Sequence, residues 1–421
     1  MGNINDLISQ MCPNGCEYKS LDEISNRIKG MTGVSNKWAD KGNCQFIDYL
    51  NVYNHLKVDT SLRPFATVKK QEQTSLKTGD ILITSASETP DECALSAVIE
   101  NDIEDNTFLD DHLFGIRIND KYANSVNPSY VNYYFHSGEF RRILPKAVRG
   151  VTRYYISLPE FMELEIPIPP LPVQEEIVRI LDRFTELEAE LEAELEMRKK
   201  QYEYYRDKML SLSDYDGEVK ESIFSDLCDI QNGFAFKSAS FGKGASKVLK
   251  ITNIGFDGNI VTDNMITIDK SDYPKTNFNS YEVHNGNIVI ALSGATTGKI
   301  SRSKSDDIFL LNQRTAKFLP HDDLDESYLY HYLSAKVDKF LQMAGGGAQP
   351  NLSTTKIEEI NIVVPADINE QKRIASVLDK FSTLTEDISE GLPAEIKMRH
   401  QQYEYYRDKL LAFKRLERET V

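Results

Sequence analysis

One stretch of this sequence is written twice, and the repeat limits the architectures that the chain can adopt. Residues 197–210 read MRKKQYEYYRDKML and residues 398–411 read MRHQQYEYYRDKLL, so the block YEYYRDK recurs intact about two hundred residues later. A period this long is not that of a solenoid, whose units span roughly 20–50 residues. The chain is therefore expected to contain two copies of one unit.

The repeat extends well beyond this block, because further pairs of segments recur in the same order. The pairs are LDEISNRIKG (21–30) with FSDLCDIQNG (224–233), FIDYLNV (46–52) with VLKITNI (248–254), GDILITSAS (79–87) with GNIVIALSG (286–294), SYVNYYFHS (129–137) with SYLYHYLSA (327–335), and GVTRYYIS (150–157) with GGAQPNLS (346–353). The second and third pairs show the alternation and β-branched runs of strands, and the fourth shows helical spacing. This order predicts a duplicated domain that mixes strands and helices.

Each copy then continues into a long helical segment. Apolar residues such as Ile177, Leu181 and Phe184 follow steps of three and four, which is the pattern of a coiled-coil seam. In the second copy Gly391 and Pro393 interrupt the pattern, and a proline inside a helix costs about 3 kcal/mol, so we expect a break there. Two such seams in one chain favour an antiparallel helix pair.

These observations define the expected organisation. The fold class is α+β, with two tandem-duplicated mixed α/β domains separated by two long helices that form an antiparallel coiled coil. The expected parts are domain 1 (residues 1–165), a first spacer helix (166–213), domain 2 (214–365) and a second spacer helix (366–421).

Composition narrows the class of protein further. The sequence contains no run of eighteen apolar residues and no basic leader followed by an apolar core, so we expect no membrane span and a cytoplasmic location. The five cysteines include one close pair, Cys12 and Cys16, without a second pair at zinc-ligand spacing, and we expect reduced thiols. The net charge of −16 argues against a nucleic-acid partner. However, glutamates concentrate in residues 186–196, whereas arginines and lysines cluster in residues 141–153, so a basic face remains possible.

Two motifs resemble catalytic signatures, and both fail on inspection. SGATTGKIS (293–301) has three residues between its glycines instead of the four of a phosphate-binding loop, and isoleucine follows its lysine, so we expect a tight turn. NPSY (127–130) resembles the tetrapeptide of amino-methyltransferases, but its repeat counterpart (325–328) reads DESY, a helix start with a polar cap. The seven histidines are scattered. We therefore expect no catalytic residues and no metal site.

Taken together, the chain resembles a type I restriction-modification specificity subunit over nearly its whole length. The matching residues are GDIL and GNIV, LNQR (311–314), AQPNLS (348–353), IPPLPVQEEI (168–177), INEQKRI (368–374) and both QYEYYRDK blocks. In that family two target-recognition domains each read one half of a split DNA sequence, while the helices set the spacing and bind methyltransferase subunits. The first copy has VTRYYIS (151–157) and LDDHLFG (109–115) instead of AQPNLS and LNQR, so an asymmetric target is expected.

The resemblance implies a set of partners. They are double-stranded DNA, two methyltransferase subunits and, in the full complex, motor-nuclease restriction subunits. S-adenosylmethionine is expected in the methyltransferase subunits, and no cofactor is expected in this chain. A stiff helical spacer agrees with this assignment, because it fixes the distance between two contacts on a duplex, which a flexible linker does not.

Candidate DNA contacts are basic and polar residues, each of which is equally well explained as a solvated surface residue. In domain 1 they are Lys69, Lys70, Arg142, Lys146, Arg149, Arg153 and Tyr154, and in domain 2 they are Lys237, Lys299, Arg302, Lys304, Arg314, Gln349 and Asn351. The tyrosines of QYEYYRDK recur at seam spacing. The charged residues that follow them are expected to face away from the seam and to form a repeated docking surface: Arg206, Asp207, Arg407 and Asp408.

Two other function classes compete with this interpretation. One is a two-domain scaffold that binds proteins, with the acidic helix as a solvated strut. The other is a solitary enzyme such as a fused methyltransferase, which requires a methyl-donor loop and an intact catalytic tetrapeptide that the sequence lacks. Sequence-specific DNA binding that weakens with salt would distinguish a DNA specificity subunit from a protein-binding scaffold, because counterion release accompanies binding to a polyelectrolyte such as DNA.

Overall fold

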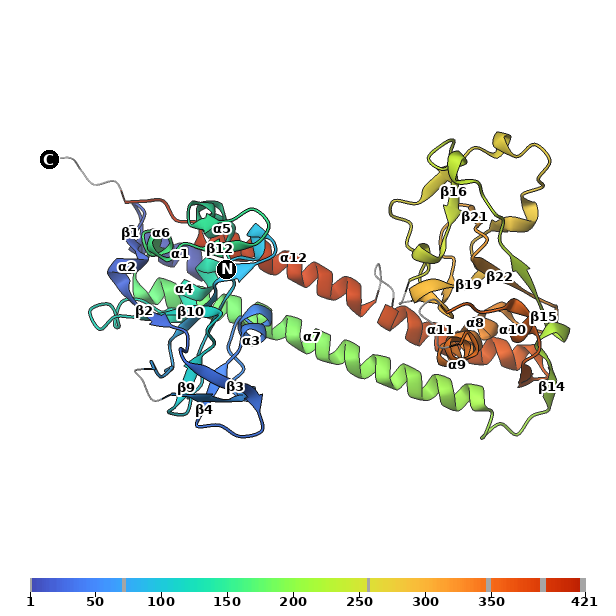
Figure 1. Ribbon diagram of the computed structural model, residues 1–421, viewed down its shortest axis with the longest axis horizontal. Helices are drawn as coiled ribbons and strands as arrows, with labels where there is room; N and C mark the ends of the chain where they lie inside the picture. The colour runs from blue at the N-terminus through green and yellow to red at the C-terminus, as the bar shows by residue number, and fades with distance from the viewer. Residues whose placement is uncertain (1, 70–72, 256–257, 346–349, 387–390, 417–421) are drawn as a thin grey trace. The chain divides into compact units, whose positions relative to one another are not determined.

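The computed structural model describes residues 2–69, 73–255, 258–345, 350–386 and 391–416, which divide into two compact units (Figure 1). Unit 1 comprises Met1–Ala189 and Met398–Val421, and unit 2 comprises Glu190–Lys397. Each unit therefore combines one copy of the repeated domain with the beginning of its own helical segment and the end of the helical segment from the other copy. Among the described residues, no helix has the length and apolar character needed to span a membrane.

Unit 1 begins with a short helix and then alternates strands with short helices. Its elements are α1 (Gly2–Met11), β1 (Glu17–Ser20), α2 (Leu21–Ile24), β2 (Ser25–Lys29), β3 (Val34–Ala39), β4 (Cys44–Ile47), α3 (Tyr49–Asn54), β5 (Phe65–Val68), β6 (Ile81–Thr84), β7 (Ala86–Ser87), β8 (Ser96–Val98), β9 (Thr107–Leu109), β10 (Leu113–Ile118), α4 (Pro128–Phe135), α5 (Gly138–Ile143), β11 (Val148–Arg149), β12 (Tyr154–Ile156), α6 (Leu158–Met162), β13 (Glu165–Ile168) and the start of α7 (Leu171–Ser211).

Unit 2 repeats much of this order after the end of α7. Its elements are β14 (Val219–Ile223), β15 (Cys228–Asn232), β16 (Ser246–Leu249), β17 (Ile266–Ile268), β18 (Glu282–Val283), β19 (Ile288–Ala291), β20 (Ile300–Arg302), β21 (Phe309–Leu311), β22 (Thr315–Pro320), α8 (Glu326–Ser334), α9 (Val337–Met343), α10 (Thr354–Glu358), β23 (Asn361–Pro365), α11 (Ile368–Glu386) and the start of α12 (Leu392–Leu411).

The sheets confirm that the two domains are copies of one fold. Domain 1 has an antiparallel sheet of order β2-β10-β6-β8, and domain 2 has the equivalent sheet β15-β22-β19-β20. Both domains also pair two strands in parallel, β4 with β9 and β16 with β21. The expected mixture of strands and helices is thus built twice.

The central strands follow directly from the GDIL and GNIV segments. Every residue of β6 and of β19 is buried, as expected for β-branched runs in the middle of a sheet. Each strand is preceded by a glycine with positive φ, +88° at Gly79 and +93° at Gly286, where a side chain would be strained.

Both strand predictions for the second pair of segments were too long: in the second copy β16 ends at Leu249, and a 3₁₀ helix (Ile251–Asn253) follows. The first copy shows the same change. The structure ends β4 at Ile47, and residues 49–54 form helix α3. The change occurs at Asp48, whose side chain accepts a hydrogen bond from the backbone N–H of Asn51 and caps the helix. The alternating apolar letters after Asp48 therefore belong to a helix start.

The NPSY segment is a helix cap in the structure. Asn127 is the N-cap of α4, and its side chain accepts hydrogen bonds from the N–H groups of Ser129 and Tyr130. Its counterpart Asp325 caps α8 in the same way. The capping interaction occupies the Asn127 side chain, which agrees with rejecting it as a base-binding group.

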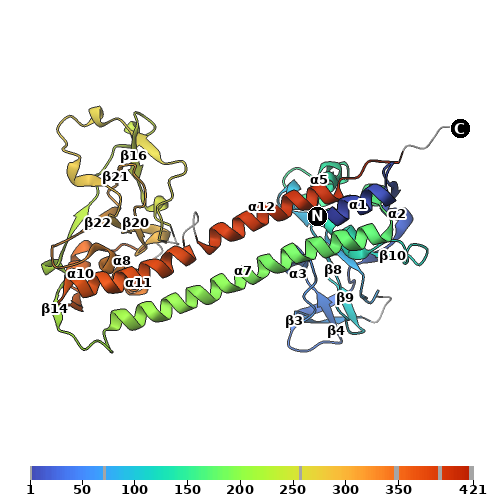
Figure 2. The ribbon, with the colours of Figure 1, turned by 180° about the vertical axis from the view of Figure 1, so that it is seen from behind.

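Within each unit, the two helical segments pack as an antiparallel pair. In unit 1 the rings of Phe184 on α7 and Tyr406 on α12 stack with centroids 5.4 Å apart, and α1 lies beside the end of α12 (Figures 1 and 2). In unit 2 the rings of Tyr205 on α7 and Phe381 on α11 stack at 5.8 Å. Helix α7 is continuous over 41 residues. The second segment restarts at α12 with Pro393 in its first turn, where its missing N–H costs nothing, so the expected interruption is confirmed.

A fully buried glutamine ties each helical segment to its domain. The side-chain oxygen of Gln174 accepts from the N–H of Asn127, and its amide donates to the carbonyls of Ser125 and Pro169, over distances of 2.6 to 2.8 Å. Gln371 repeats the pattern in unit 2 with the N–H of Asp325 and the carbonyls of Asp323 and Pro365. Each glutamine satisfies three backbone groups, of which the proline carbonyl is buried and the other two are part-buried.

Replacing either glutamine with alanine is expected to lower the free energy of unfolding of its own unit by about 2 kcal/mol, because buried backbone groups lose their partners. Hydrogen exchange read by mass spectrometry on the full chain assigns the loss to unit 1 for Gln174→Ala and to unit 2 for Gln371→Ala. The exposed Gln10→Ala is the control and should change neither unit. Equal loosening of both units by one variant would contradict the prediction.

His136 makes the stability of unit 1 sensitive to acid. Its Nε2 lies 2.8 Å from the carbonyl oxygen of Ser96, and burial, aided by the cation of Arg141, lowers the pKa of His136 to about 4. The unfolded chain takes up this proton below its ordinary pKa of about 6.5, whereas the folded chain does not until about pH 4. Stability contributed by neutral His136 is therefore lost as the pH falls through this window.

Lowering the pH from 7 to 5 is expected to reduce the free energy of unfolding of unit 1 by about 2 kcal/mol, because the unfolded chain binds a proton at His136 and the folded chain does not. Urea unfolding of the full chain at both pH values, compared with His136→Gln, isolates this part because the variant has no titrating imidazole. The variant should be less stable at pH 7 and lose less on acidification. The same acid-induced loss in both proteins would refute the assignment.

Candidate nucleic-acid interface

Three segments converge on one face of domain 2. The N–H of Leu292, at the end of β19, donates to the carbonyl of Arg314 at 2.9 Å, and the N–H of Leu352 donates to the carbonyl of Leu292 at 2.7 Å. Ser293 and Asn351 form a β-bridge. We call residues 292–294, 312–314 and 350–352 the domain 2 face. It brings together two predicted DNA contacts, Arg314 and Asn351, and both are exposed.

Domain 1 builds the same face with different side chains. Its backbone bonds run from the N–H of Ser85 to the carbonyl of His112 at 3.4 Å and from the N–H of Ile156 to the carbonyl of Ser85 at 2.9 Å. Tyr155 pairs with Ala86. We call residues 85–87, 110–112 and 154–156 the domain 1 face. His112 and Tyr155 take the places of Arg314 and Asn351.

Sequence reasoning missed His112 and Tyr155. The side chain of His112 is 66% exposed and Tyr155 is 53% exposed. The signal that identifies them is the internal alignment: LDDH stands where LNQR stands in the second copy, and Tyr155 lies two residues before a serine, as Asn351 does. A comparison of the copies position by position finds both.

The domain 1 face carries acidic groups that a lysine neutralises. Asp110, Asp111 and His112 present ligand atoms within 4.8 Å of one another. The ammonium of Lys37 lies 3.1 Å from Asp110 and also pairs with Asp111. Burial acts to lower the pKa of Lys37, but these two carboxylates raise it, so the ammonium stays charged and holds the cluster.

Of the described DNA contacts predicted for domain 1, only Tyr154 belongs to this face, where it pairs with Ser87. Lys69 is exposed beyond β5, while Arg142 and Lys146 line a separate hollow with Glu139. The exposed Arg149 pairs with Glu160 at 2.7 Å. Arg153 is exposed just before the face, and Tyr154 is half-buried within it, in β12. Lys70 lies outside the described residues.

In domain 2 the predicted cations have different surroundings. Lys237 and Lys304 are exposed, whereas Lys299 is half-buried and burial lowers its pKa. Lys299 follows a short 3₁₀ turn (Gly294–Thr296) after β19, so SGATTGKIS is the tight turn that the sequence predicted. Gln349 lies outside the described residues.

Arg302 is part of an internal polar network of unit 2. Its guanidinium lies 2.7 Å from the carboxylate of Asp379 and stacks on the ring of Tyr330 at 4.5 Å. His331, fully buried, contacts the same carboxylate at 3.0 Å and receives the hydroxyl of Tyr202 at 3.0 Å on its other nitrogen. The structure thus gives Arg302 a second role, and its contact with DNA stays a prediction.

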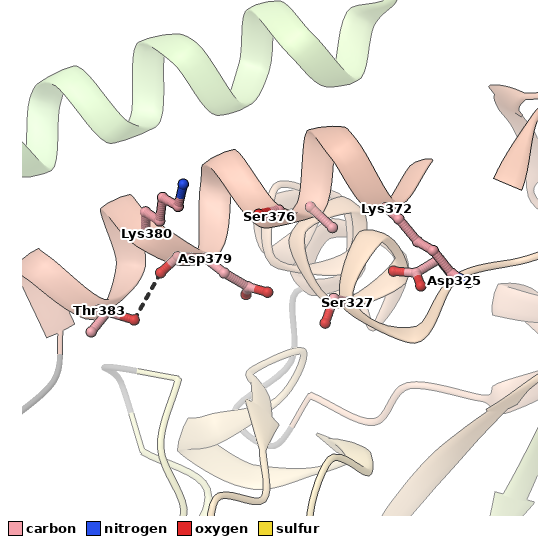
Figure 3. Close-up of a pocket in the computed structure, with 8 residues that line it drawn as sticks. Asp325, Ser327, Lys372, Ser376, Asp379, Lys380 and Thr383 are labelled. Carbon is pink, nitrogen blue, oxygen red and sulfur yellow. Dashed lines mark hydrogen bonds between the residues drawn. The ribbon is translucent and has the colours of Figure 1, made fainter. Parts of the chain in front are cut away.

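The electrostatics of this network centre on Asp379. Burial acts to raise the pKa of Asp379, but hydrogen bonds from His331 and Arg302 and the charge of Arg302 lower it to about 2. Figure 3 shows Asp379 extending from α11 beside Ser327 of α8, with Thr383 one turn further along α11; all three line an open hollow of about 490 Å³. Two lysines on the same helix, Lys372 and Lys380, also line the hollow.

The expectation that Arg206 and Arg407 face away from the seam is wrong. Their side chains are only 17% and 14% exposed, and each guanidinium stacks at 5.6 Å on the buried tyrosine four residues earlier, Tyr202 or Tyr403. Residues four apart share one face of a helix, so the arginines lie on the buried side. Each also pairs with the next residue, Asp207 or Asp408, at 2.9 Å.

A different part of the repeated block is exposed in both units. Tyr204 and Tyr405 are 62% and 60% exposed, and Met197 and Met398 are 65% and 62% exposed. Residues seven apart lie on one helix face two turns apart, so each unit presents a methionine and a tyrosine together. We call these pairs the repeated Met/Tyr face.

Comparisons with known proteins agree with this architecture. A family model described as the type I restriction modification DNA specificity domain matches residues 13–197 and 217–398. The EcoR124I/EcoR124II specificity subunit of a type I restriction enzyme from Escherichia coli is 34% identical over 279 residues, which are 62% of this chain and 66% of that protein. A putative type I restriction enzyme specificity subunit from Haemophilus influenzae is 28% identical over 411 residues, 94% of this chain and 95% of that protein.

A solved structure shows the same fold. The S subunit of a type I restriction-modification system from M. genitalium aligns with a TM-score of 0.56 at 13% identity, covering 94% of this chain and 96% of that one. At this identity the likeness concerns the fold alone.

Proposed function

We propose a function that proceeds from one premise: the chain belongs to the type I restriction-modification DNA specificity family. The chain reads a two-part, asymmetric DNA target in the cytoplasm, with residues 1–165 reading one half and residues 214–365 the other. The observation that carries the proposal is the convergent face, which recurs in both domains with the same backbone bonds but different exposed side chains. Identical scaffolds with different side chains suit two different half-sites.

The charge of the chain determines how this contact works. With a net charge of −16, binding depends on local cations such as Arg314, Arg153 and Lys69. Polar side chains at the faces, Asn351 in one domain and His112 and Tyr155 in the other, are placed to read base edges. The affinity should therefore fall steeply with salt.

Catalysis belongs to the partners in this proposal. Two methyltransferase subunits bring S-adenosylmethionine and transfer its methyl group to adenine, and motor-nuclease subunits join them for restriction. This chain supplies recognition and positioning, with no catalytic residue of its own. The continuous helix α7 belongs to both units, so it is the element that sets the spacing between the half-sites.

We place one methyltransferase subunit on each copy of the repeated Met/Tyr face. The two copies are nearly equally exposed and carry the same letters, so one partner surface fits both. The carboxylates of Asp207 and Asp408, with 64% and 45% exposed side chains, supply polar contacts beside the face. Arg206 and Arg407 hold these carboxylates in place from the buried side.

The decisive experiment is co-expression with the neighbouring methyltransferase gene, followed by sequencing that maps N6-methyladenine in the host DNA. A split motif with two unequal halves, one of which changes when residues 214–365 are exchanged for those of a relative, is the expected result. A stable complex that leaves DNA unmethylated would favour a protein-binding scaffold instead.

The docking assignment predicts a change in stoichiometry. Tyr204→Ser and Tyr405→Ser should each reduce the number of bound methyltransferase subunits from two to one, because each removes the central aromatic anchor of one site. Native mass spectrometry of the co-purified complex measures this number. Lys199→Ser, an exposed change on the opposite side of the same helix, is the control. Two subunits retained by both tyrosine variants would exclude this face.

A further inference from the structure

Strand β3 holds the chain's one tryptophan in a strained and exposed position. Trp38 is 61% exposed and has a φ of +65°, and Asn36, two residues earlier, has a φ of +49°. The pairing of β3 with β5 shifts register between Ser35 and Ala39, which marks a β-bulge. A bulky residue in left-handed backbone is uncommon, and bulges of this kind re-aim side chains beside functional sites.

The surroundings hold this geometry in place. The indole meets the ring of the fully buried Phe46 edge-on, with centroids 5.6 Å apart. The neighbouring Lys37 anchors the bulge, because its ammonium pairs with Asp110 and Asp111. These two residues belong to the domain 1 face, so the bulge that carries Trp38 is fixed to that face.

The surroundings of Trp38 combine apolar and basic side chains, which match the apolar base faces and the charged phosphates of DNA. Phe65, paired across the strands with Ala39, is 38% exposed and extends the apolar surface. Lys41, three residues after Trp38 and next to the exposed Asp40, is exposed, whereas Lys69 follows the far end of β5, where Val68 pairs with Val34. An exposed aromatic ring can stack on a base, and a nearby lysine such as Lys41 can contact the adjacent phosphate.

Domain 2 shows that the fold does not require an exposed aromatic here. Between β15 and β16 its described residues form a short 3₁₀ helix (Ser238–Ser240), and no strand like β3 is present. Phe236 in this interval is only 8% exposed and packs against Tyr273 and Phe278. The same region thus has its aromatic side chains buried or partly buried in domain 2 and an exposed one, Trp38, in domain 1.

We propose that Trp38 is a DNA-contacting wedge that stacks on a base step of the half-site read by domain 1. The inference rests on the proposed function, since DNA is the ligand. Wedge side chains partly unstack a base step and bend the duplex, which adds discrimination by the deformability of the step. Domain 1 therefore reads its half-site partly by shape, in addition to the contacts made by the domain 1 face.

The test uses the complex assembled with the methyltransferase subunits and a duplex that contains its methylated motif. The fluorescence of the wild-type complex minus that of the Trp38→Phe complex isolates the signal of Trp38. Stacking should quench this difference signal as the duplex saturates the complex. Trp38→Ala should weaken binding roughly 10- to 100-fold, whereas Trp38→Phe should retain most of the affinity. Leu319→Ala, which truncates a 38% exposed apolar side chain on β22 of domain 2, is the control.

The outcomes separate this inference from the function on which it rests. If the wild-type complex methylates its motif but Trp38 shows no quenching and Trp38→Ala binds normally, the wedge is refuted while the function stands. Loss of methyltransferase subunits from the Trp38→Ala complex would also overturn it, because Trp38 would then be a protein contact. Absence of any methylated motif would count against the proposed function itself.

Discussion

Asp379→Ala is expected to destabilise unit 2 by about 4 kcal/mol. The carboxylate of Asp379 accepts from Arg302 at 2.7 Å and from His331 at 3.0 Å. The Arg302 side chain is 16% exposed and His331 is fully buried, so removing the carboxylate leaves a mostly desolvated cation without its counter-ion. Breaking one partner of a buried pair costs more than the pair contributes, because the remaining charge is left uncompensated.

Hydrogen exchange of the full chain measures this loss in the peptides of unit 2. Asp379→Asn should be milder, because its amide oxygen still accepts a hydrogen bond, and the exposed Asp338→Ala should have no effect. The equivalent Asp182→Ala in unit 1 should cost about 2 kcal/mol, since Asp182 pairs with the uncharged hydroxyl of Tyr133 and with Lys57, whose side chain is 38% exposed. A loss below about 1 kcal/mol for Asp379→Ala would contradict the argument.

Much of this fold could be predicted because each sequence pattern occurs twice, so that one copy can be checked against the other. The order of the repeated segments predicted two domains. The helix caps at Asn127 and Asp325 could be recognised as polar residues that precede aromatic segments. The end of β4 was not readable in the same way, because Asp48 interrupts an alternating pattern that continues into a helix. A cap overrides periodicity when its side chain reaches the next turn.

The candidate site was predicted less completely, because exposure depends on packing between distant segments. Arg302 reads as a surface cation, yet its partner Asp379 lies 77 residues away in the sequence. Arg314 and Asn351 were identified as polar residues of the LNQR and AQPNLS motifs, and they do converge, because backbone hydrogen bonds and a β-bridge join both motifs to residues 292 and 293. Trp38 was missed for the opposite reason: the described residues of domain 2 contain no equivalent strand, so the repeat offers no comparison there.

Grafting the domain 1 turn onto domain 2 is expected to weaken binding of the target DNA by more than 100-fold. The graft replaces Asn312, Gln313 and Arg314 by Asp, Asp and His, which are the residues at positions 110–112. It removes the cation of Arg314, for which we propose a base contact worth about 1–3 kcal/mol, and it adds two carboxylates that would repel phosphates in the proposed complex. In domain 1 Lys37 neutralises the equivalent carboxylates, but the described residues of domain 2 contain no strand that could supply such a lysine.

The graft should preserve the fold, because both turns use the same backbone bond. The N–H of Thr315 donates to the carbonyl of Asn312 at 2.8 Å, as the N–H of Leu113 donates to that of Asp110 at 3.1 Å. Fluorescence anisotropy with a labelled duplex measures the affinity of the assembled complex, and the salt dependence should become shallower as a phosphate or base contact is lost. Arg314→Lys, which keeps the charge but not the planar fork, should lose much less. If the grafted complex binds within about threefold of the wild type, the domain 2 face does not contact DNA, since losing even one base contact costs more.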